Sequence, residues 1–365
     1  MLVYLLNYLS IPLWMGINKN KKQVTFIICL QMFLILALRA DTLGADLGNY
    51  ALYYKTWSKH TFGEMIGATR FGLNHQIGWG LESGYVWLCW ICAKVGFSFH
   101  GFLVVHALIC IAGIYRFVKN NAANKPLTLA LFISFGIYQT FFYILRQALA
   151  FVVLLNSLKW IKKRKIWIFL LYVCVAILFH RVAIPFLFIY FLYNINITRK
   201  TFISVYIVCI GIVILIKPLY RIVFLPILGI AGKSDLYILG DFTMNNMIIL
   251  MVCISLFIML MTNTGRLFID GNRRIYFWAM SFALFLESVS LYAPVYSRVA
   301  ISLFFPFAIV LFTDVISMQK IWLNKVIWTT TIYLLSFAFY IYQLLGSSIV
   351  PYMSIMFDMI YFGRG

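Results

Sequence analysis

Long apolar runs dominate this chain and are separated by short polar segments. Two examples are residues 247–261 and 275–286, neither of which contains a charged residue. A bilayer core admits only helices and closed barrels, because unpaired backbone groups are too costly there. A barrel would alternate apolar and polar residues over segments of about 10 residues, and these runs do not alternate. We therefore predict an all-α, polytopic integral membrane protein.

The number of apolar runs sets the expected number of transmembrane helices. At about 20 residues per span, a chain of 365 residues allows roughly 11–13 of them. The first run has no basic segment before it, so we interpret it as a span and not as a cleavable signal peptide. Residues 1–365 are expected to form a single polytopic membrane domain. The predicted spans are 1–17, 23–39, 101–118, 126–144, 147–161, 166–180, 182–197, 201–217, 246–262, 275–293, 299–316 and 326–344.

Composition excludes the other broad classes. The chain is 64% hydrophobic and 11% charged, whereas soluble domains average about 45–50% apolar and 25% charged residues. Disorder requires low hydrophobicity and is excluded as well. The net charge is +20, but most basic residues occur in short clusters between apolar runs. That pattern is typical of topology signals in a membrane protein, so no nucleic-acid partner is expected.

The basic clusters predict which loops face the cytoplasm. They hold 18 of the 30 Lys and Arg residues, and they would leave outside the membrane a large periplasmic loop at 40–100 and a second one at 218–245. The apolar stretch near 85–95 is only about half a span long. Counting it as a full crossing would move the basic cluster Lys162–Lys165 to the outside. We therefore predict a re-entrant segment there, next to an outward-facing cavity.

Several cationic residues occur at helix ends that this topology places outside. Arg39, Arg146 and Arg298 each lie at such an end, and His180 with Arg181 lies at another. One alternative is that these side chains only reach lipid headgroups. The other is a site for pyrophosphate, because the planar guanidinium binds two oxygens at once and stays charged. Such a site would also stabilise a departing pyrophosphate as its charge develops.

The acidic residues outside supply candidate bases. Asp46 and Glu82 flank the half-span, and either is a candidate for accepting a hydroxyl proton. Alternatively, Asp41 or Asp46 only caps a short loop helix, and Glu82 begins the helix at Tyr85 because the helix dipole favours a negative charge there. Glu287 lies within a span and is either functional or an ion-pair partner of Arg298 that fixes packing. His180 is a base, a phosphate ligand or a structural histidine.

The remaining chemistry-bearing residues give weaker signals. Tyr50 and Tyr85 belong to an aromatic outer loop that suits sugar rings or the membrane interface. Cys89 and Cys92 form a C-x-x-C pair that is either a thiol site or a pair of small apolar side chains. The histidines have no metal-site spacing, so we expect no metal and no cofactor.

Five short motifs lie at the predicted outer ends of the helices. They are Arg39 followed by Gly44-x-Asp46-x-x-x-Tyr50, Glu82-x-x-Tyr85, Arg146-Gln147-x-x-Ala150, Phe179-His180 with Ala183, and Tyr296-x-Arg298. In their order and placement these motifs resemble the EpsG-like branch of the Wzy-type bacterial polysaccharide polymerases. Val182 stands where this family usually has a small polar residue between its His and Ala.

The resemblance implies a GT-C-like fold in the bacterial inner membrane with an active site that faces the periplasm. It implies a metal-independent glycosyltransferase that moves a growing glycan from undecaprenyl pyrophosphate to a new lipid-linked repeat unit, for O-antigen, capsule or exopolysaccharide synthesis. Its partners would be the lipid-linked oligosaccharide, membrane lipids and a chain-length regulator protein. Arg39, Arg146 and Arg298 would hold pyrophosphates, and Asp46, Glu82 or His180 would act on the acceptor hydroxyl.

Two other functions fit the same features. An O-antigen ligase, or another lipid-dependent glycosyltransferase, would share the outward cavity. A flippase for lipid-linked oligosaccharides would require two related bundles with charges that face both sides. The sequence shows no two-fold repeat, and the charges outside the cytoplasmic clusters gather on one side.

Overall fold

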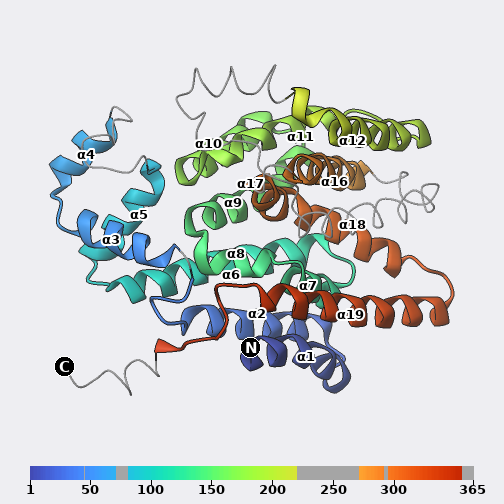
Figure 1. Cartoon of the computed structure of the whole chain (residues 1–365), viewed down its shortest axis with the longest axis horizontal. Helices are drawn as coiled ribbons and strands as arrows, with labels where there is room; N and C mark the ends of the chain where they lie inside the picture. The colour runs from blue at the N-terminus through green and yellow to red at the C-terminus, as the bar shows by residue number, and fades with distance from the viewer. Residues whose placement is uncertain (45, 71–80, 220–270, 292–294, 356–365) are drawn as a thin grey trace. The chain divides into compact units, whose positions relative to one another are not determined.

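The computed structural model describes residues 1–44, 46–70, 81–219, 271–291 and 295–355, and every regular element in this part of the chain is a helix (Figure 1). An isolated antiparallel bridge between Arg39 and Ser354 also occurs there. The prediction of an all-α fold is confirmed. The predicted span 246–262 and residues 220–245 of the second predicted loop lie outside the described residues.

The chain divides into two compact units. The first contains residues 1–187 and 320–365, and the second contains residues 188–319. The prediction of a single membrane domain stays a prediction. The first unit has the helices α1 (Leu2–Ile17), α2 (Lys21–Ala37), α3 (Leu47–Ser58), α4 (Phe62–Arg70), α5 (Ser83–Lys94), α6 (Phe99–Asn121), α7 (Lys125–Ser134), α8 (Ile137–Tyr143), α9 (Leu145–Lys162), α10 (Ile166–Phe179), the 3-10 helix η1 (Arg181–Phe186) and α19 (Trp322–Leu345).

The second unit contains most of α11 and the helices from α12 to α18. Within this unit α16 packs against both α12 and α18. A short π-helical segment, η4, joins α17 to α18. The bounds are α11 (Leu187–Leu192), α12 (Arg199–Leu219), α16 (Gly271–Ser290), α17 (Val295–Val299), η4 (Ala300–Phe304) and α18 (Phe305–Ser317).

Several helices begin at polar side chains that cap them. Asn20 Oδ1 accepts a hydrogen bond from the backbone N–H of Lys22, and Ser98 Oγ accepts one from Gly101. Such caps satisfy backbone donors that have no partner within the helix. The starts of α2 and α6 are therefore encoded locally, at the polar breaks between apolar runs.

The helices have the lengths and surfaces of a membrane protein. By length and composition, Phe99–Asn121 and Tyr296–Ser317 can each cross a membrane alone, and a bent pair adds a third candidate. Large apolar side chains face outward, including Trp167 at 81% exposure. A surface rich in exposed apolar side chains suits lipid and is costly in water. The protein is thus embedded in a membrane, while the number of 11–13 spans stays a prediction.

The bent pair is the predicted span 126–144, which the structure divides in two. α7 and α8 meet at an angle of 53°. The break lies at Phe135 and Gly136, where Gly136 has φ +80°. Glycine adopts this left-handed conformation without steric cost, which ends the first helix. One residue after α8, at Leu145, α9 begins.

The predicted outer loop 40–100 is folded where it is described. A buried apolar cluster is formed by Trp57 of α3, Met65 of α4, Leu81 just before α5, and Val86 within α5. α5 also packs against α6 and α10. The predicted half-span near 85–95 is helical, with 12 residues in α5, and its entry into the membrane stays a prediction.

Candidate functional site

Glu82 is the centre of the candidate site. Its Oε2 accepts a hydrogen bond from Arg146 Nη1 at 2.5 Å, and its Oε1 accepts one from the backbone N–H of Arg181 at 3.3 Å. His180 Nδ1 lies 3.9 Å from the same Oε1. We call Glu82, Arg146, His180, Arg181 and Tyr50 the Glu82 cluster. Residues far apart in sequence thus meet at four helix ends.

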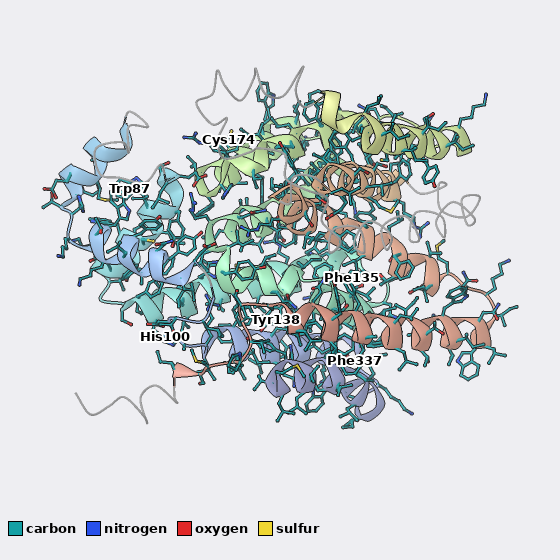
Figure 2. The ribbon with its side chains drawn as sticks, in the orientation of Figure 1. Trp87, His100, Phe135, Tyr138, Cys174 and Phe337 are labelled. Atoms are coloured by element: carbon teal, nitrogen blue, oxygen red, sulfur yellow. The ribbon has the colours of Figure 1, made fainter. Side chains whose placement is uncertain are left out.

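Local backbone features bring these ends together. Glu82 directly precedes α5, Arg146 is the second residue of α9, and His180 separates α10 from η1. α5 approaches α10 closely at Gly84, where an added Cβ would lie 2.7 Å from the Leu178 carbonyl oxygen. A side chain at this position would hold the two helices apart. Trp87 marks α5 in Figure 2.

The hydrogen bonds of His180 define its neutral form. Its Nδ1 accepts a hydrogen bond from the backbone N–H of Val182 at 3.1 Å, so this nitrogen carries no proton. A neutral imidazole then has its proton on Nε2 and can donate from there. Because the backbone of Val182 makes the contact, its apolar side chain does not disturb this arrangement.

Tyr50, a member of the Glu82 cluster, packs against Tyr85. Both side chains are buried, and their ring centroids lie 5.5 Å apart. The Tyr50 hydroxyl accepts a hydrogen bond from the Arg146 guanidinium, and burial raises the pKa of Tyr50 although Arg146 opposes this shift. Tyr50 therefore remains a neutral phenol at physiological pH.

The carboxylate of Asp46 forms no hydrogen bond and no ion pair with any described residue. It occupies the N-cap position of α3, yet its side chain makes no capping hydrogen bond. Asp46 therefore begins α3 without the side-chain hydrogen bond by which a cap stabilises a helix. The residue is half-buried and lies one turn before Tyr50, near enough for its charge to influence that phenol.

Arg39 lies in different surroundings from Arg146. Its side chain is fully buried, and its Nη1 donates to the Leu36 carbonyl at 3.1 Å. The guanidinium carbon lies 5.4 Å from the centroid of the Phe142 ring. Nε and Nη2 have no hydrogen-bond partner among the described residues. The structure therefore does not join Arg39 to the Glu82 cluster by any direct contact.

Glu287 and Arg298 belong to the second unit. Glu287 is buried, and its carboxylate accepts hydrogen bonds from Ser290 and Ser297 Oγ, each at 3.0 Å. Arg298 is exposed within α17. The two serines, which the sequence did not single out, satisfy the buried carboxylate. A role of Glu287 and Arg298 beside the Glu82 cluster stays a prediction.

The structure also shows an ion pair that we did not predict. His100 Nδ1 lies 2.8 Å from Asp41 Oδ1, at the start of α6 (Figure 2). These residues are 59 positions apart, and no local motif indicates that they meet. In the part of the chain that the structure describes, no three His, Cys, Asp or Glu residues are grouped as metal ligands would be.

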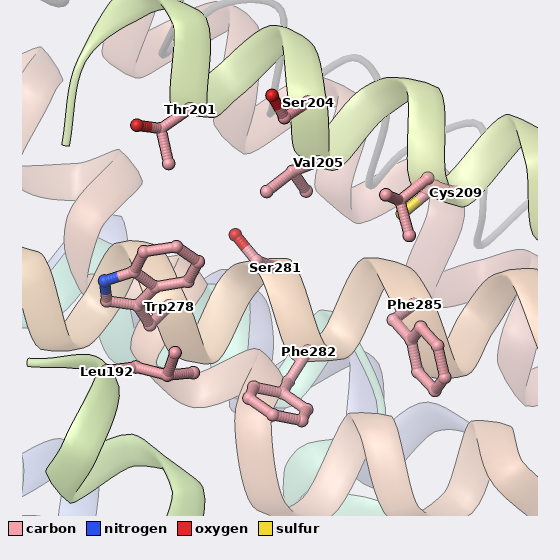
Figure 3. Close-up of a pocket in the computed structure, with 10 residues that line it drawn as sticks. Leu192, Thr201, Ser204, Val205, Cys209, Trp278, Ser281, Phe282 and Phe285 are labelled. Carbon is pink, nitrogen blue, oxygen red and sulfur yellow. The ribbon is translucent and has the colours of Figure 1, made fainter. Parts of the chain in front are cut away.

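A pocket in the second unit has a different character (Figure 3). It measures about 320 Å³ and lies between α12 and α16. Its lining is apolar apart from the hydroxyls of Thr201, Ser204 and Ser281 and the indole N–H of Trp278. No charged side chain lines it. This pocket is unsuited to a diphosphate.

Comparison with known proteins gives one match. The model of the EpsG family matches residues 22–354. No curated protein and no solved structure matches the chain.

Proposed function

The chain belongs to the EpsG family, a Wzy-type polysaccharide polymerase-like family, and from this premise we propose that it joins lipid-linked oligosaccharide repeat units into a polysaccharide. Membership supports a role of the polysaccharide polymerase type. The finer proposal is that the growing glycan leaves undecaprenyl pyrophosphate and is transferred to a new lipid-linked unit. The product would be O-antigen, capsule or exopolysaccharide.

The convergence of charged groups in the Glu82 cluster is the observation that carries the proposal. The Glu82 carboxylate pairs with the Arg146 guanidinium and accepts a hydrogen bond from the backbone N–H of Arg181, whose side chain is exposed. Arg146 is 23% and His180 26% exposed at the side chain, whereas Glu82 is 9% exposed. An anion can therefore reach the side chains of Arg146 and His180, whereas the Glu82 carboxylate is less accessible. Guanidinium groups in partly dry sites favour phosphate oxygens.

The proposed transfer is a substitution at the anomeric carbon. The acceptor hydroxyl oxygen forms a bond to this carbon, and the bond from the carbon to the pyrophosphate oxygen breaks. The pyrophosphate leaves with the electron pair, and the hydroxyl proton passes to a carboxylate. Arg146 and Arg181 would stabilise the charge that develops on the leaving group.

The contacts favour different roles for the two acidic residues. Both oxygens of Glu82 already accept hydrogen bonds from Arg146 and Arg181. Glu82 would therefore position Arg146. Asp46, with no hydrogen bond to the described residues, is the better proton acceptor, and His180 would donate from Nε2 to a phosphate or sugar oxygen. Tyr50 and Tyr85 would hold Arg146 in place.

The setting of the reaction belongs to the same proposal. The active site would face the periplasm from the inner membrane, with membrane lipids and a chain-length regulator protein as partners. Arg298 would hold the pyrophosphate of the second substrate. Neither a metal nor another cofactor takes part in the proposed steps.

The test is complementation of a deletion strain followed by analysis of its surface glycan. The strain should accumulate single repeat units, and Arg146→Ala or Asp46→Asn should fail to restore long chains. If single units still reach the cell surface in the deletion strain, the protein is a polymerase and not a flippase. Loss of a flippase would leave no repeat unit outside. Wild-type chain lengths in both variants would refute the assignment of the site. Loss of glycan attachment with intact lipid-linked polymer would indicate a ligase.

A further inference from the structure

The C-terminal ends of α6 and α9 meet at a surface rich in basic residues. The two helices pack against each other, and Nζ of Lys162, the last residue of α9, donates to Oδ1 of Asn121, the last residue of α6, at 3.2 Å. At a rise of about 1.5 Å per residue, the length of α9 separates this surface from Arg146 by about 24 Å. The surface is therefore distinct from the Glu82 cluster. We call it the basic turn, and its members are Lys119, Lys159, Lys162, Lys163, Arg164 and Lys165.

The chain supplies no nearby acidic residue to balance the basic turn. Positions 83–234 contain neither Asp nor Glu. Lys159, Lys163 and Lys165 are exposed and form no ion pair with a described residue. The C-terminal end of a helix carries about half a negative charge, which is far less than the charge of the basic turn. Anions from outside the chain therefore balance it.

Aromatic rings lie against three of the ammonium groups. Nζ of Lys159 lies 4.4 Å from the centroid of the Trp160 ring, and Nζ of Lys163 lies 5.8 Å from it. Lys119 Nζ lies 5.5 Å from the centroid of the Tyr115 ring. Tryptophan and tyrosine favour the level of the lipid headgroups. The indole N–H of Trp160 has no acceptor among the described residues. A ligand with several acceptor oxygens at headgroup level would satisfy this donor and the ammonium groups together.

Arg164 has a strained backbone within the basic run Lys162–Lys165. Its φ is +55°, and among the described residues no other non-glycine residue has a positive φ. Its N–H bonds to the Ile161 carbonyl at 3.0 Å, and that of Lys165 bonds to the Trp160 carbonyl at 2.9 Å. Such a turn after a helix usually has glycine at this position. A topology signal requires only that the loop contain basic residues, so it does not account for an arginine at the strained position.

We propose that the basic turn binds the headgroup of an anionic phospholipid. The phosphate oxygens accept hydrogen bonds from the ammonium groups of Lys159 and Lys163 and from the guanidinium of Arg164. The acyl chains lie along α10, which follows the turn directly and exposes the apolar side chains of Trp167 and Leu171. Clusters of roughly 4–8 basic residues beside a membrane helix attract anionic lipids. This site goes beyond the proposed function and does not depend on it.

Matched charge variants test the site. Full-length protein is purified in detergent, and its affinity for cardiolipin is measured by native mass spectrometry. Lys159→Gln with Lys163→Gln should weaken binding by about tenfold or more, because each basic residue contributes separately. Lys320→Gln with Lys325→Gln removes the same charge around the start of α19 and should bind as the wild type does. Equal loss in both variants would indicate an effect of net charge and overturn the site, and so would unchanged binding in both.

Variants of Arg164 separate lipid binding from folding. Arg164→Gly removes the guanidinium and relieves the backbone strain. It should bind cardiolipin about fivefold more weakly and melt at no lower temperature than the wild type. Arg164→Lys keeps the charge and should bind more tightly than Arg164→Gly. If Arg164→Gly bound cardiolipin as tightly as the wild type, or if it lost stability, the proposed role of the strained arginine would be refuted.

Lysine acetylation distinguishes the sources of the phosphate group. Protein in phosphatidylcholine nanodiscs is treated with an acetylating reagent, and acetylation of Lys163 is followed by mass spectrometry. Cardiolipin added to the nanodiscs should slow the reaction, whereas inorganic diphosphate in the buffer should not. Protection by diphosphate alone would overturn the lipid as ligand, and protection by neither compound would overturn the anion site. None of these readouts requires glycan synthesis, so a failure of this site and a failure of the proposed function are distinguishable.

Discussion

Gly84→Ala should weaken the candidate site without touching any of its charged groups. The new Cβ would lie 2.7 Å from the Leu178 carbonyl oxygen and 2.9 Å from its Cβ. Ordinary van der Waals contact begins near 3.4 Å, so α5 must retreat from α10 by about 0.7 Å. The obstacle includes backbone, which cannot rotate away as a flexible side chain can. Overpacking of this kind costs about 1–3 kcal/mol of folding stability.

The displacement reaches Glu82, two residues before Gly84. The bond from the Arg181 N–H to Glu82 is already 3.3 Å long, and a further 0.7 Å would break it. Hydrogen bonds to charged groups contribute about 1.5–3 kcal/mol. Because 1.4 kcal/mol corresponds to a factor of 10, we expect the rate of glycan elongation to fall by about 10- to 100-fold.

The assay is chain elongation by purified protein on lipid-linked repeat units, with glycan length read from gels. Gly48→Ala is the matched control, because its Cβ would meet no atom within 4 Å, and its rate should equal that of the wild type. The amount of folded protein is measured in parallel by size-exclusion chromatography. A Gly84→Ala protein that folds in normal amount and elongates glycan at the wild-type rate would refute the reasoning.

Three further predictions address separate contacts. His180→Asn and His180→Ala should both lose the Nε2 donor, but His180→Ala should lose about tenfold more activity in the elongation assay, because an amide oxygen can replace Nδ1 as acceptor for the Val182 N–H; equal losses would contradict the role of Nδ1. Gly113→Ala should lower stability by about 1–3 kcal/mol in thermal unfolding, because its Cβ would lie 2.8 Å from Val152 Cβ, and an unchanged melting temperature would contradict the close packing of α6 and α9. Ser297→Ala should cost about 1–3 kcal/mol in the same measurement by removing a donor from buried Glu287, with exposed Ser348→Ala as the neutral control.

The helices were largely predictable because their boundaries depend on local chemistry. The apolar run alone placed the first span at 1–17, and the structure has α1 at Leu2–Ile17. The predicted span 166–180 agrees with α10 equally well. The division of 126–144 was missed because the apolar run continues across Gly136. Its left-handed backbone depends on packing that hydropathy does not record.

The candidate site was predictable in its members and not in its pairings. Positive charges outside the expected cytoplasmic clusters identified Arg146 and Arg39 alike. The structure gives Arg146 a carboxylate partner and leaves Arg39 buried with an unpartnered edge. This difference arises from tertiary contacts, because Glu82 lies beside Arg146 whereas the Phe142 ring lies beside Arg39. The pair of Asp41 with His100 was missed for the same reason.

The junction between α8 and α9 makes Arg146 sensitive to the length of the chain. Ile144 is at once the C-cap of α8 and the N-cap of α9, so no loop exists there to absorb an extra residue. Each residue added to a helix turns everything beyond it by about 100° and advances it by 1.5 Å. A single insertion or deletion between residues 137 and 145 would thus point Arg146 away from Glu82. We expect natural relatives to vary in sequence across this junction and to keep its length constant.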